Sequence, residues 1–188
     1  MFMPETAVAL LCGLAAGAAL AGGDGGNETA APRLGQPIEA AAAARFDLNV
    51  FPDGRGLPPG RGNAVQGRAL FRAQCVVCHG EGGRGASAEE VAGGSEPLTS
   101  EWPDKTIGLY WPHATTIFDF VRRAKPMTSP GSLSADEVYA LTAYLLYANR
   151  VIGEHDEMNA KTLPQVRLPN RDGFSDVDAK APPRLAEP

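Results

Sequence analysis

Residues 75–79 read Cys-Val-Val-Cys-His, a pentapeptide that constrains the chain more than any other stretch of its sequence. Two intervening residues let one helical turn carry both thiols on one side, with the adjacent imidazole pointing the same way. C-x-x-C-H is the attachment sequence of c-type haem, in which each thiol adds across a vinyl group and the histidine ligates the iron. The motif therefore predicts that Cys75 and Cys78 hold one covalent haem c, with His79 as the proximal iron ligand.

Two other kinds of site also use paired cysteines. A structural zinc site needs further Cys or His ligands, but the one remaining cysteine, Cys12, lies in an apolar N-terminal run. A thioredoxin-like redox pair belongs in a βαβ pattern, which the flanking sequence does not show. Both alternatives are disfavoured, and no cysteine is left for a disulfide.

The first 21 residues indicate an export signal. Residues 7–20 form an Ala/Leu/Gly-rich apolar run that is too short to span a bilayer comfortably, and Ala19-Leu20-Ala21 fits a small-x-small cleavage site. The residues before this run contain no Lys or Arg, so an uncleaved membrane anchor is the alternative. We expect a periplasmic protein with no stable membrane insertion after signal cleavage.

The rest of the chain divides by composition into three parts. Residues 22–62 are rich in Gly, Ala and Pro and predict a flexible leader followed by a wrapping segment. Residues 63–152 carry the helical patterns and predict a cytochrome c domain. Residues 153–188 predict an extended, proline-rich tail. A hydrophobic core formed by residues 63–152 alone would give only marginal stability, so we expect haem insertion and folding to be coupled.

Apolar residues recur at helical spacing three times within 63–152. The predicted helices are one from a cap at Asn63 into Cys75, one over 117–124 capped by Thr115 or Thr116, and one from the capping box Ser134-Ala135-Asp136-Glu137 to about Asn149. No stretch alternates long enough to form a sheet. The pattern predicts an all-α, class I cytochrome c fold: three to five short helices around one covalent haem, with long N- and C-terminal extended segments.

The second iron ligand is expected from the loop between the middle and last helices. A low-spin electron-transfer haem needs a Met or His opposite its proximal histidine, and Met127 is the one methionine of that loop. Nearby prolines restrict the loop, so ligation costs little entropy. We therefore predict Met127 as the distal ligand. His113 and Lys125 are alternatives, although an amine must first lose its proton, and Met127 also suits a packing role.

Polar and aromatic residues near the motif are candidates for holding the macrocycle. We expect Tyr110 and Trp111 to pack against it and Arg84 to neutralise a propionate. Further candidates for these roles are Lys105, Arg122 and Trp102.

The charge pattern bears on the choice of partner. The formal net charge is −5, with no block of basic residues and no interleaving of basic and aromatic side chains. We expect no nucleic-acid partner, and the negative charge favours a partner with a basic patch.

Several stretches together resemble one cytochrome family. They are the attachment motif, PDGRGLPPG at 52–60, KTIGLYWP at 105–112, FDFVRRA at 118–124, DEVYALTAYLLY at 136–147, LP at 163–164 and PNRDGF at 169–174. This pattern, over about residues 34–174, resembles the cytochrome c subunit of Sox-type sulfane dehydrogenase and the related haem subunits of bacterial sulfite dehydrogenases.

The resemblance implies a periplasmic class I cytochrome whose partner is a molybdenum-cofactor dehydrogenase subunit that oxidises sulfite or sulfane sulfur. This chain would accept electrons from that partner one at a time and pass them to a downstream cytochrome c. It would be an electron-transfer subunit and not a catalyst by itself. The alternatives are a haem enzyme or sensor with an open sixth iron position, and a general soluble electron carrier.

Two of the departures from this family concern the haem. The family usually places its axial methionine directly before the loop proline, where this chain has Lys125, and Met127 follows Pro126 instead. Some members carry two haem domains, whereas one attachment motif predicts a mono-haem chain.

Overall fold

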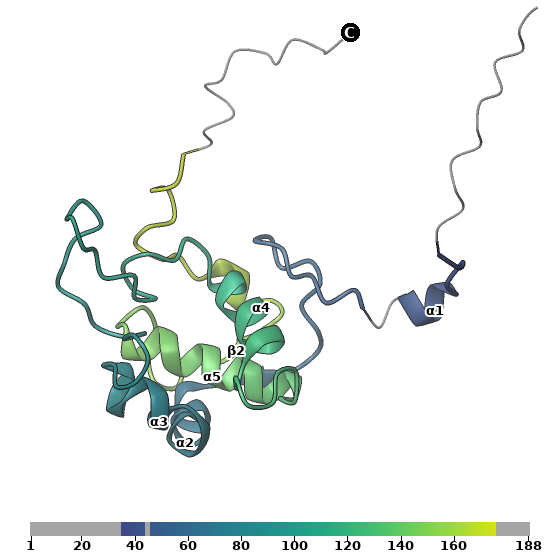
Figure 1. Ribbon diagram of the computed structural model, residues 1–188, viewed down its shortest axis with the longest axis horizontal. Helices are drawn as coiled ribbons and strands as arrows, with labels where there is room; N and C mark the ends of the chain where they lie inside the picture. Colours follow the sequence, from purple (N-terminus) through teal and green to yellow (C-terminus); the bar gives the residue numbers. More distant parts are fainter. Residues whose placement is uncertain (1–34, 44–45, 176–188) are drawn as a thin grey trace, which may run out of the picture. The chain divides into compact units, whose positions relative to one another are not determined.

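The computed structural model describes residues 35–43 and 46–175 (Figure 1). The predicted export signal, Cys12 and the last residues of the tail lie outside this part of the chain. Residues 35–37 belong to a separate N-terminal unit, and the described residues from Ile38 onward form the second unit. In chain order the elements are α1 (Ala40–Ala43), β1 (Arg61–Gly62), α2 (Ala64–Gln74), α3 (Val76–His79), the 3₁₀ turn η1 (Glu81–Gly83), α4 (Ala114–Ala124), α5 (Ala135–Ala148), β2 (Met158–Asn159) and the 3₁₀ turn η2 (Leu163–Gln165).

Helix α2 begins where the sequence predicts. The Asn63 side chain accepts a hydrogen bond from the backbone N–H of Gln66 at 3.1 Å, and the Gln66 side chain accepts from the backbone N–H of Asn63 at 3.1 Å. These reciprocal bonds satisfy amide groups that a helix start otherwise leaves without partners. Because α2 ends at Cys75, this cap also fixes where the attachment motif leaves the helix.

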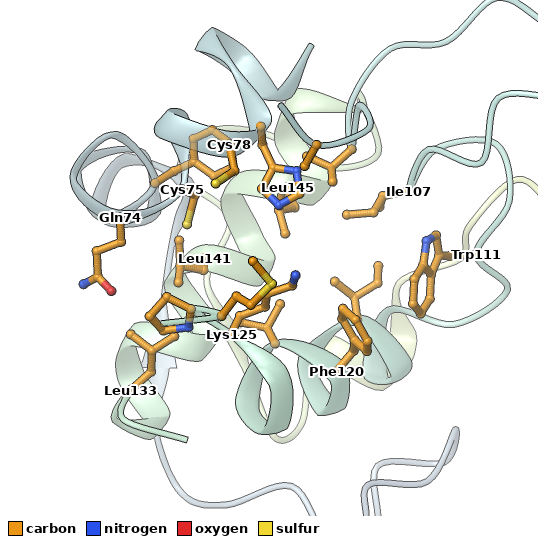
Figure 2. Close-up of a pocket in the computed structure, with 18 of the residues that line it drawn as sticks. Gln74, Cys75, Cys78, Ile107, Trp111, Phe120, Lys125, Leu133, Leu141 and Leu145 are labelled. Atoms are coloured by element: carbon orange, nitrogen blue, oxygen red, sulfur yellow. The ribbon is translucent and has the colours of Figure 1, made fainter. Parts of the chain in front are cut away.

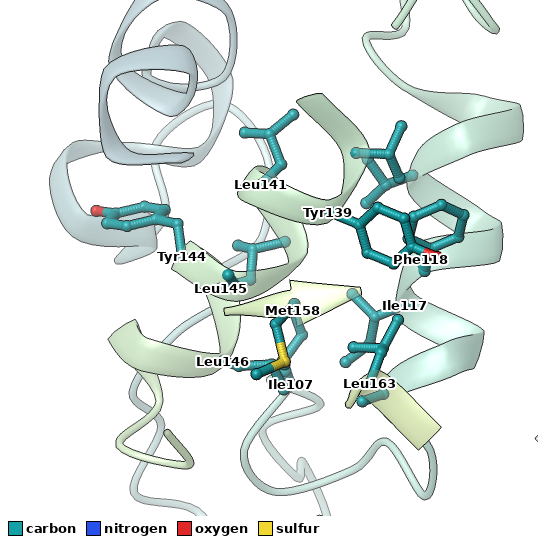
Figure 3. Close-up of a cluster of buried hydrophobic side chains, with 14 of the residues drawn as sticks. Ile107, Ile117, Phe118, Tyr139, Leu141, Tyr144, Leu145, Leu146, Met158 and Leu163 are labelled. Atoms are coloured by element: carbon teal, nitrogen blue, oxygen red, sulfur yellow. The ribbon is translucent and has the colours of Figure 1, made fainter. Parts of the chain in front are cut away.

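Helix α5 is the centre of the core. It starts at the predicted capping box, in which Glu137 accepts from the backbone N–H of Ser134 at 2.8 Å. Residues 138–146 are all buried because α2 and α4 both pack against this helix. Figure 3 shows Tyr139 of α5 against Phe118 of α4, with ring centroids 4.5 Å apart.

Two glycines let the preceding chain approach α5 closely. A Cβ atom at Gly62 would lie 2.5 Å from the backbone nitrogen of Ala140, and one at Gly67 would lie 1.9 Å from the Ala140 carbonyl oxygen. Neither position has room for a methyl group, so β1 and α2 contact α5 backbone to backbone. This contact holds α2, and the motif at its end, against the central helix.

The predicted wrapping segment is bonded to α4 and α5. The backbone N–H of Val50 donates to Asp119 Oδ1 at 3.2 Å, and the Tyr139 hydroxyl donates to the carbonyl oxygen of Pro58 at 2.9 Å. Burial raises the pKa of Tyr139 to about 12, so its hydroxyl stays protonated and remains a donor. These bonds hold residues 50–58 on the two helices.

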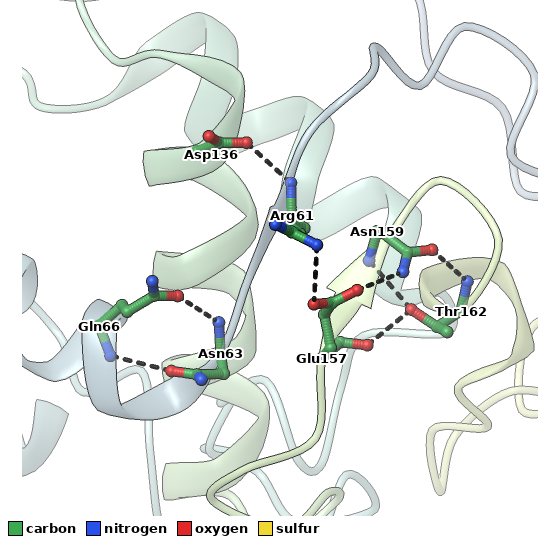
Figure 4. Close-up of polar contacts among 7 residues, drawn as sticks. All are labelled: Arg61, Asn63, Gln66, Asp136, Glu157, Asn159 and Thr162. Carbon is green, nitrogen blue, oxygen red and sulfur yellow. Dashed lines mark hydrogen bonds and ion pairs between the residues drawn. The ribbon is translucent and has the colours of Figure 1, made fainter.

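The tail beyond α5 also contributes to the core. Strand β2 pairs antiparallel with β1, and beside this pair the backbone N–H of Arg61 donates to Asp136 of α5 at 2.8 Å (Figure 4). Met158, Leu163 and Leu168 are buried. An extended tail is predicted here, but these three side chains make it part of the folded unit. Their five-residue spacing matches neither the helical nor the strand period, so no periodic pattern marks them as core.

Helix α4 starts earlier than predicted. Its N-cap residue is His113, so the predicted caps at Thr115 and Thr116 are wrong. Thr115 lies in the first turn and is buried, which places its hydroxyl in the core and away from the helix end. The all-α prediction is confirmed, since the strands have two residues each. No helix in the described part of the chain is both long and apolar enough to cross a membrane.

Candidate haem-binding site

Cys75 joins α2 to α3 and sets the geometry of the motif. Its carbonyl oxygen accepts hydrogen bonds from the backbone N–H groups of Cys78 at 3.1 Å and His79 at 2.9 Å. The resulting turn brings both thiols and the imidazole to the wall of one cavity. Val77, in the middle of the motif, is 79% exposed, so it does not line that wall.

The ring orientation of His79 is set by a backbone atom. Its Nδ1 lies 3.1 Å from the carbonyl oxygen of Glu89. A carbonyl oxygen can only accept, so Nδ1 carries the proton and donates. Nε2 of the neutral ring then keeps its lone pair, which is the atom and tautomer that metal ligation requires.

The cavity beside the motif is apolar and large enough for a ligand. Its volume is about 300 Å³, at the lower end of the range of small-molecule sites, roughly 300–1,000 Å³. Its apolar wall includes Phe71, Ile107, Trp111, Ile117, Leu141 and Leu145. Figure 2 shows Ile107, Trp111, Leu141 and Leu145 around one space, with Cys75 and Cys78 on one side and Lys125 on the other. Helices α2, α4 and α5 and the segment from Lys105 to Trp111 all contribute to it.

The segment after α4 forms the wall that faces the motif. Lys125, Pro126 and Met127 all line the cavity. Lys125 is partly buried, and its Nζ lies 5.5 Å from the centre of the Phe120 ring. Met127 is 76% exposed, so its side chain lies at the mouth of the cavity. Burial raises the pKa of the Cys75 thiol, and the positive charge of Lys125 partly opposes this shift.

The remaining predicted site residues divide between the cavity and its surroundings. Trp111 lines the cavity, whereas Tyr110, Arg84 and His113 are not part of its wall. The Tyr110 ring packs on Phe174 instead, with centroids 5.4 Å apart. His113 caps α4, where burial and then the charge of Arg171 lower its pKa.

The donors and the cavity fit covalent haem c. Two thiols at the required spacing, an imidazole with a free Nε2 and an apolar space beside them are the groups that such a haem needs. The zinc alternative is not supported, because no group of three His, Cys, Asp or Glu side chains in residues 35–43 and 46–175 is arranged to hold a metal ion.

Two parts of this site were missed by reasoning from the sequence. The Glu89 carbonyl is a backbone group, so no residue type signals its role. Ile107, Leu141 and Leu145 look like ordinary core positions in the sequence, because an apolar wall and a core have the same composition. Only the packing of α4 and α5 in the structure shows which apolar residues line the cavity and which belong to the core.

Comparisons with known proteins agree with this geometry. A family model for cytochrome c matches residues 64–149. The chain resembles the crystal structure of the sulfane dehydrogenase SoxCD from Paracoccus pantotrophus, with 40% sequence identity, a TM-score of 0.72, and coverage of 79% of this chain and 74% of that chain.

A further relative is a thiosulfate dehydrogenase from Stutzerimonas stutzeri (strain A1501). It is 28% identical over 90 residues, which make up 47% of this chain and 28% of that protein. The chain thus spans less than a third of the length of this relative.

These findings confirm the class I cytochrome c fold, and a cytochrome c domain implies covalently bound haem c and a role in electron transport. The similarity to SoxCD covers most of both chains and extends well beyond the region shared by cytochromes c in general. The chain therefore belongs to the family of cytochrome c subunits of Sox-type sulfane dehydrogenases.

Proposed function

We propose that this chain is a periplasmic, mono-haem electron-transfer subunit. It accepts electrons from a molybdenum-cofactor sulfite or sulfane dehydrogenase subunit and passes them to a downstream cytochrome c. The observation that carries the proposal is the cavity, which has two thiols and the His79 imidazole on one wall and the segment 125–127 on the opposite wall. The single C-x-x-C-H motif supports one haem.

Within this proposal His79 is the proximal ligand, and Met127 is the distal one. The Glu89 carbonyl holds the imidazole ring in the ligating tautomer, and Met127 is close enough to line the same cavity from the facing wall. Bound haem c supplies an iron that gains and loses one electron. Trp111 packs at the side of the site, whereas Tyr110 and Arg84 are outside the cavity wall and serve at most as contacts at its rim.

The cavity wall favours electron transfer over catalysis on a bound substrate. The charged side chains of this wall are Lys105 and Lys125, and neither is paired there with a histidine or carboxylate. A peroxidase-type site needs such an acid–base pair next to the iron. Chemistry on sulfur therefore belongs to the partner, and this chain supplies a redox centre and a surface for docking.

The test combines purification with kinetics. The chain is produced with its N-terminal segment in a bacterium that matures c-type cytochromes, together with a sulfane dehydrogenase catalytic subunit. We expect the two proteins to co-purify, the mature cytochrome to start at Gly22, and sulfite or thiosulfate to reduce its haem only when the catalytic subunit is present. Reduction without stable association would support a general carrier. Rapid carbon monoxide binding to the reduced protein would indicate an open iron position and contradict the proposal.

A further inference from the structure

The segment between the two cavity-wall residues Val91 and Ile107 forms a closed loop with a fixed neck. In what we term the 95–104 loop, the Asp104 carboxylate accepts hydrogen bonds from the backbone N–H groups of Ser95 at 2.7 Å and Glu96 at 2.8 Å. The backbone N–H of Asp104 donates to the carbonyl oxygen of Glu96 at 3.3 Å. These bonds join the two ends of the loop, so its neck is formed before any partner arrives.

The neck of this loop is attached to the wall of the haem cavity. The backbone N–H of Ile107 donates to the Val91 carbonyl oxygen at 3.2 Å, and the Thr106 hydroxyl donates to the Gly93 carbonyl oxygen at 3.0 Å. Val91 and Ile107 line the cavity, and Glu89, two residues before Val91, accepts the hydrogen bond of His79. A protein bound to the loop therefore lies next to the haem site.

The loop exposes a large aromatic side chain. Trp102 is 80% exposed and Leu98 is 38% exposed. The other tryptophan of the chain, Trp111, is partly buried and packs on Phe120. Tryptophan has the largest apolar side chain, and it is highly buried on average in folded proteins. An indole held in water on a pre-formed loop has the properties of an interface anchor, since buried Trp side chains dominate binding energy in many complexes.

The stretch that includes Trp102 is mostly acidic. Residues 85–104 contain five acidic residues and no Lys or Arg, and the cations Arg84 and Lys105 flank this stretch. None of the ion pairs found within the described residues includes any of these carboxylates. Four of them, Glu89, Glu90, Glu96 and Glu101, therefore remain available to a partner, while Asp104 is used at the neck. Their field attracts a protein with a basic surface.

We propose that the 95–104 loop is the surface on which this chain docks to its dehydrogenase catalytic subunit, with Trp102 inserted into an apolar pocket that basic residues surround. The inference rests on the proposed function, because that function supplies the partner. A loop with a closed neck and an aromatic anchor fits a long-lived subunit contact better than the small, short-lived contacts of redox carriers. The downstream cytochrome is therefore assigned to another face.

The anchor is tested by measuring the dissociation constant between the purified haem-loaded chain and the purified catalytic subunit. We expect Trp102→Ala to weaken binding by about 10- to 100-fold. The matched control is Phe46→Ala, which removes an aromatic ring that is 78% exposed and outside the loop. Each variant must keep the visible spectrum and reduction potential of the parent, which shows that the haem site is intact.

The charges are tested by association rates at several salt concentrations. Glu96→Gln/Glu101→Gln should slow association about 3- to 10-fold at low salt and flatten the salt dependence, whereas Glu39→Gln/Asp47→Asn should not. If the wild-type chain binds the catalytic subunit and Trp102→Ala binds it equally tightly, the docking inference is overturned and the proposed function stands. Failure of the wild-type chain to bind would overturn both.

Discussion

Met127 and Lys125 lie on the same wall of the haem cavity, but their side chains are exposed to different degrees. Met127 lies at the mouth and Lys125 is partly buried. We expect Met127→Ala to abolish the weak far-red band of a methionine–iron(III) bond and to lower the reduction potential, because a thioether favours the ferrous state. Absorption spectroscopy and a redox titration of the purified ferric protein measure both effects.

Lys125→Ala is the matched control, since it removes a neighbouring donor from the same segment. It should keep the far-red band. If Met127→Ala leaves the spectrum unchanged while Lys125→Ala alters it, the amine is the ligand and the assignment of Met127 is wrong.

The proximal side of the site was easier to predict than the distal side. Cys75, Cys78 and His79 lie close together in the sequence, on one helical turn, so their spacing alone brings them together. The distal donor comes from a loop whose position depends on how α4 and α5 pack. The spacing of residues in the sequence does not reveal this packing. Arg84 and Tyr110 show the same limit: both are close to the motif or the cavity wall in sequence, yet neither lines the cavity.

Among the helices, the contact between α2 and α5 depends on Gly67. Alanine there would gain roughly 1 kcal/mol of helix propensity, but its Cβ would lie 1.9 Å from the Ala140 carbonyl oxygen. Overpacking of this kind costs about 1–3 kcal/mol, so we expect Gly67→Ala to lower the free energy of unfolding. Denaturant titration of the haem-loaded protein measures it, with Ala69→Ser on the exposed side of α2 as the control. A more stable Gly67→Ala protein would contradict the close contact.

The start of α5 predicts a dependence of stability on pH. Hydrogen bonds from the Ser134 backbone N–H and then its hydroxyl lower the pKa of Glu137 from its ordinary value of 4.5. A carboxylate whose pKa is lowered by folding stabilises the protein above its unfolded pKa, and this contribution is lost as the pH falls through the folded pKa. Glutamine keeps the cap but has no charge.

We therefore expect Glu137→Gln to be less stable than wild type by a few tenths of a kcal/mol at pH 7, because the charge is exposed. The difference should shrink below about pH 4.5 and then vanish. Urea titrations of both proteins across this range measure it. Ser134→Ala, which removes the hydroxyl, should cost about 1 kcal/mol. A difference between Glu137→Gln and wild type that stays constant down to low pH would contradict the role of the carboxylate.

Helices with a side-chain cap were predicted well, and elements without one were not. The structure confirms the predicted cap at Asn63 and the predicted capping box at Ser134. The N-cap residue of helix α4, His113, makes no side-chain cap bond, so the start of this helix has no local sequence signal. Strands β1 and β2 are too short to show alternation, and they pair because the tail returns across α5.

For the whole molecule, we expect folding to depend on the haem. The cavity of about 300 Å³ reaches α2, α4 and α5, and without the haem its apolar wall would be open to water, which is unfavourable. A small domain has a total stability of only about 5–15 kcal/mol, so this loss of burial weighs heavily. Cys75→Ser/Cys78→Ser should therefore yield a chain without covalent haem and with little cooperative thermal unfolding by circular dichroism.

The control for this experiment is Val77→Ser, which changes an exposed residue of the same motif and should retain haem. A double variant that lacks haem but unfolds as cooperatively as the wild type, and at the same temperature, would show that the protein scaffold does not need the macrocycle.

Met158, Leu163 and Leu168 belong to the core although they follow the last helix, and Tyr139 is bonded to Pro58, which precedes the first cavity helix. A fragment limited to residues 64–149, the stretch that the cytochrome c family model matches, would lose both of these segments. The side of α5 that they cover would then be exposed to water. We therefore expect the smallest piece that folds by itself to be longer than residues 64–149, which the cytochrome c family model matches. Excision and grafting of this redox module should keep the flanking segments from about Val50 to Leu168.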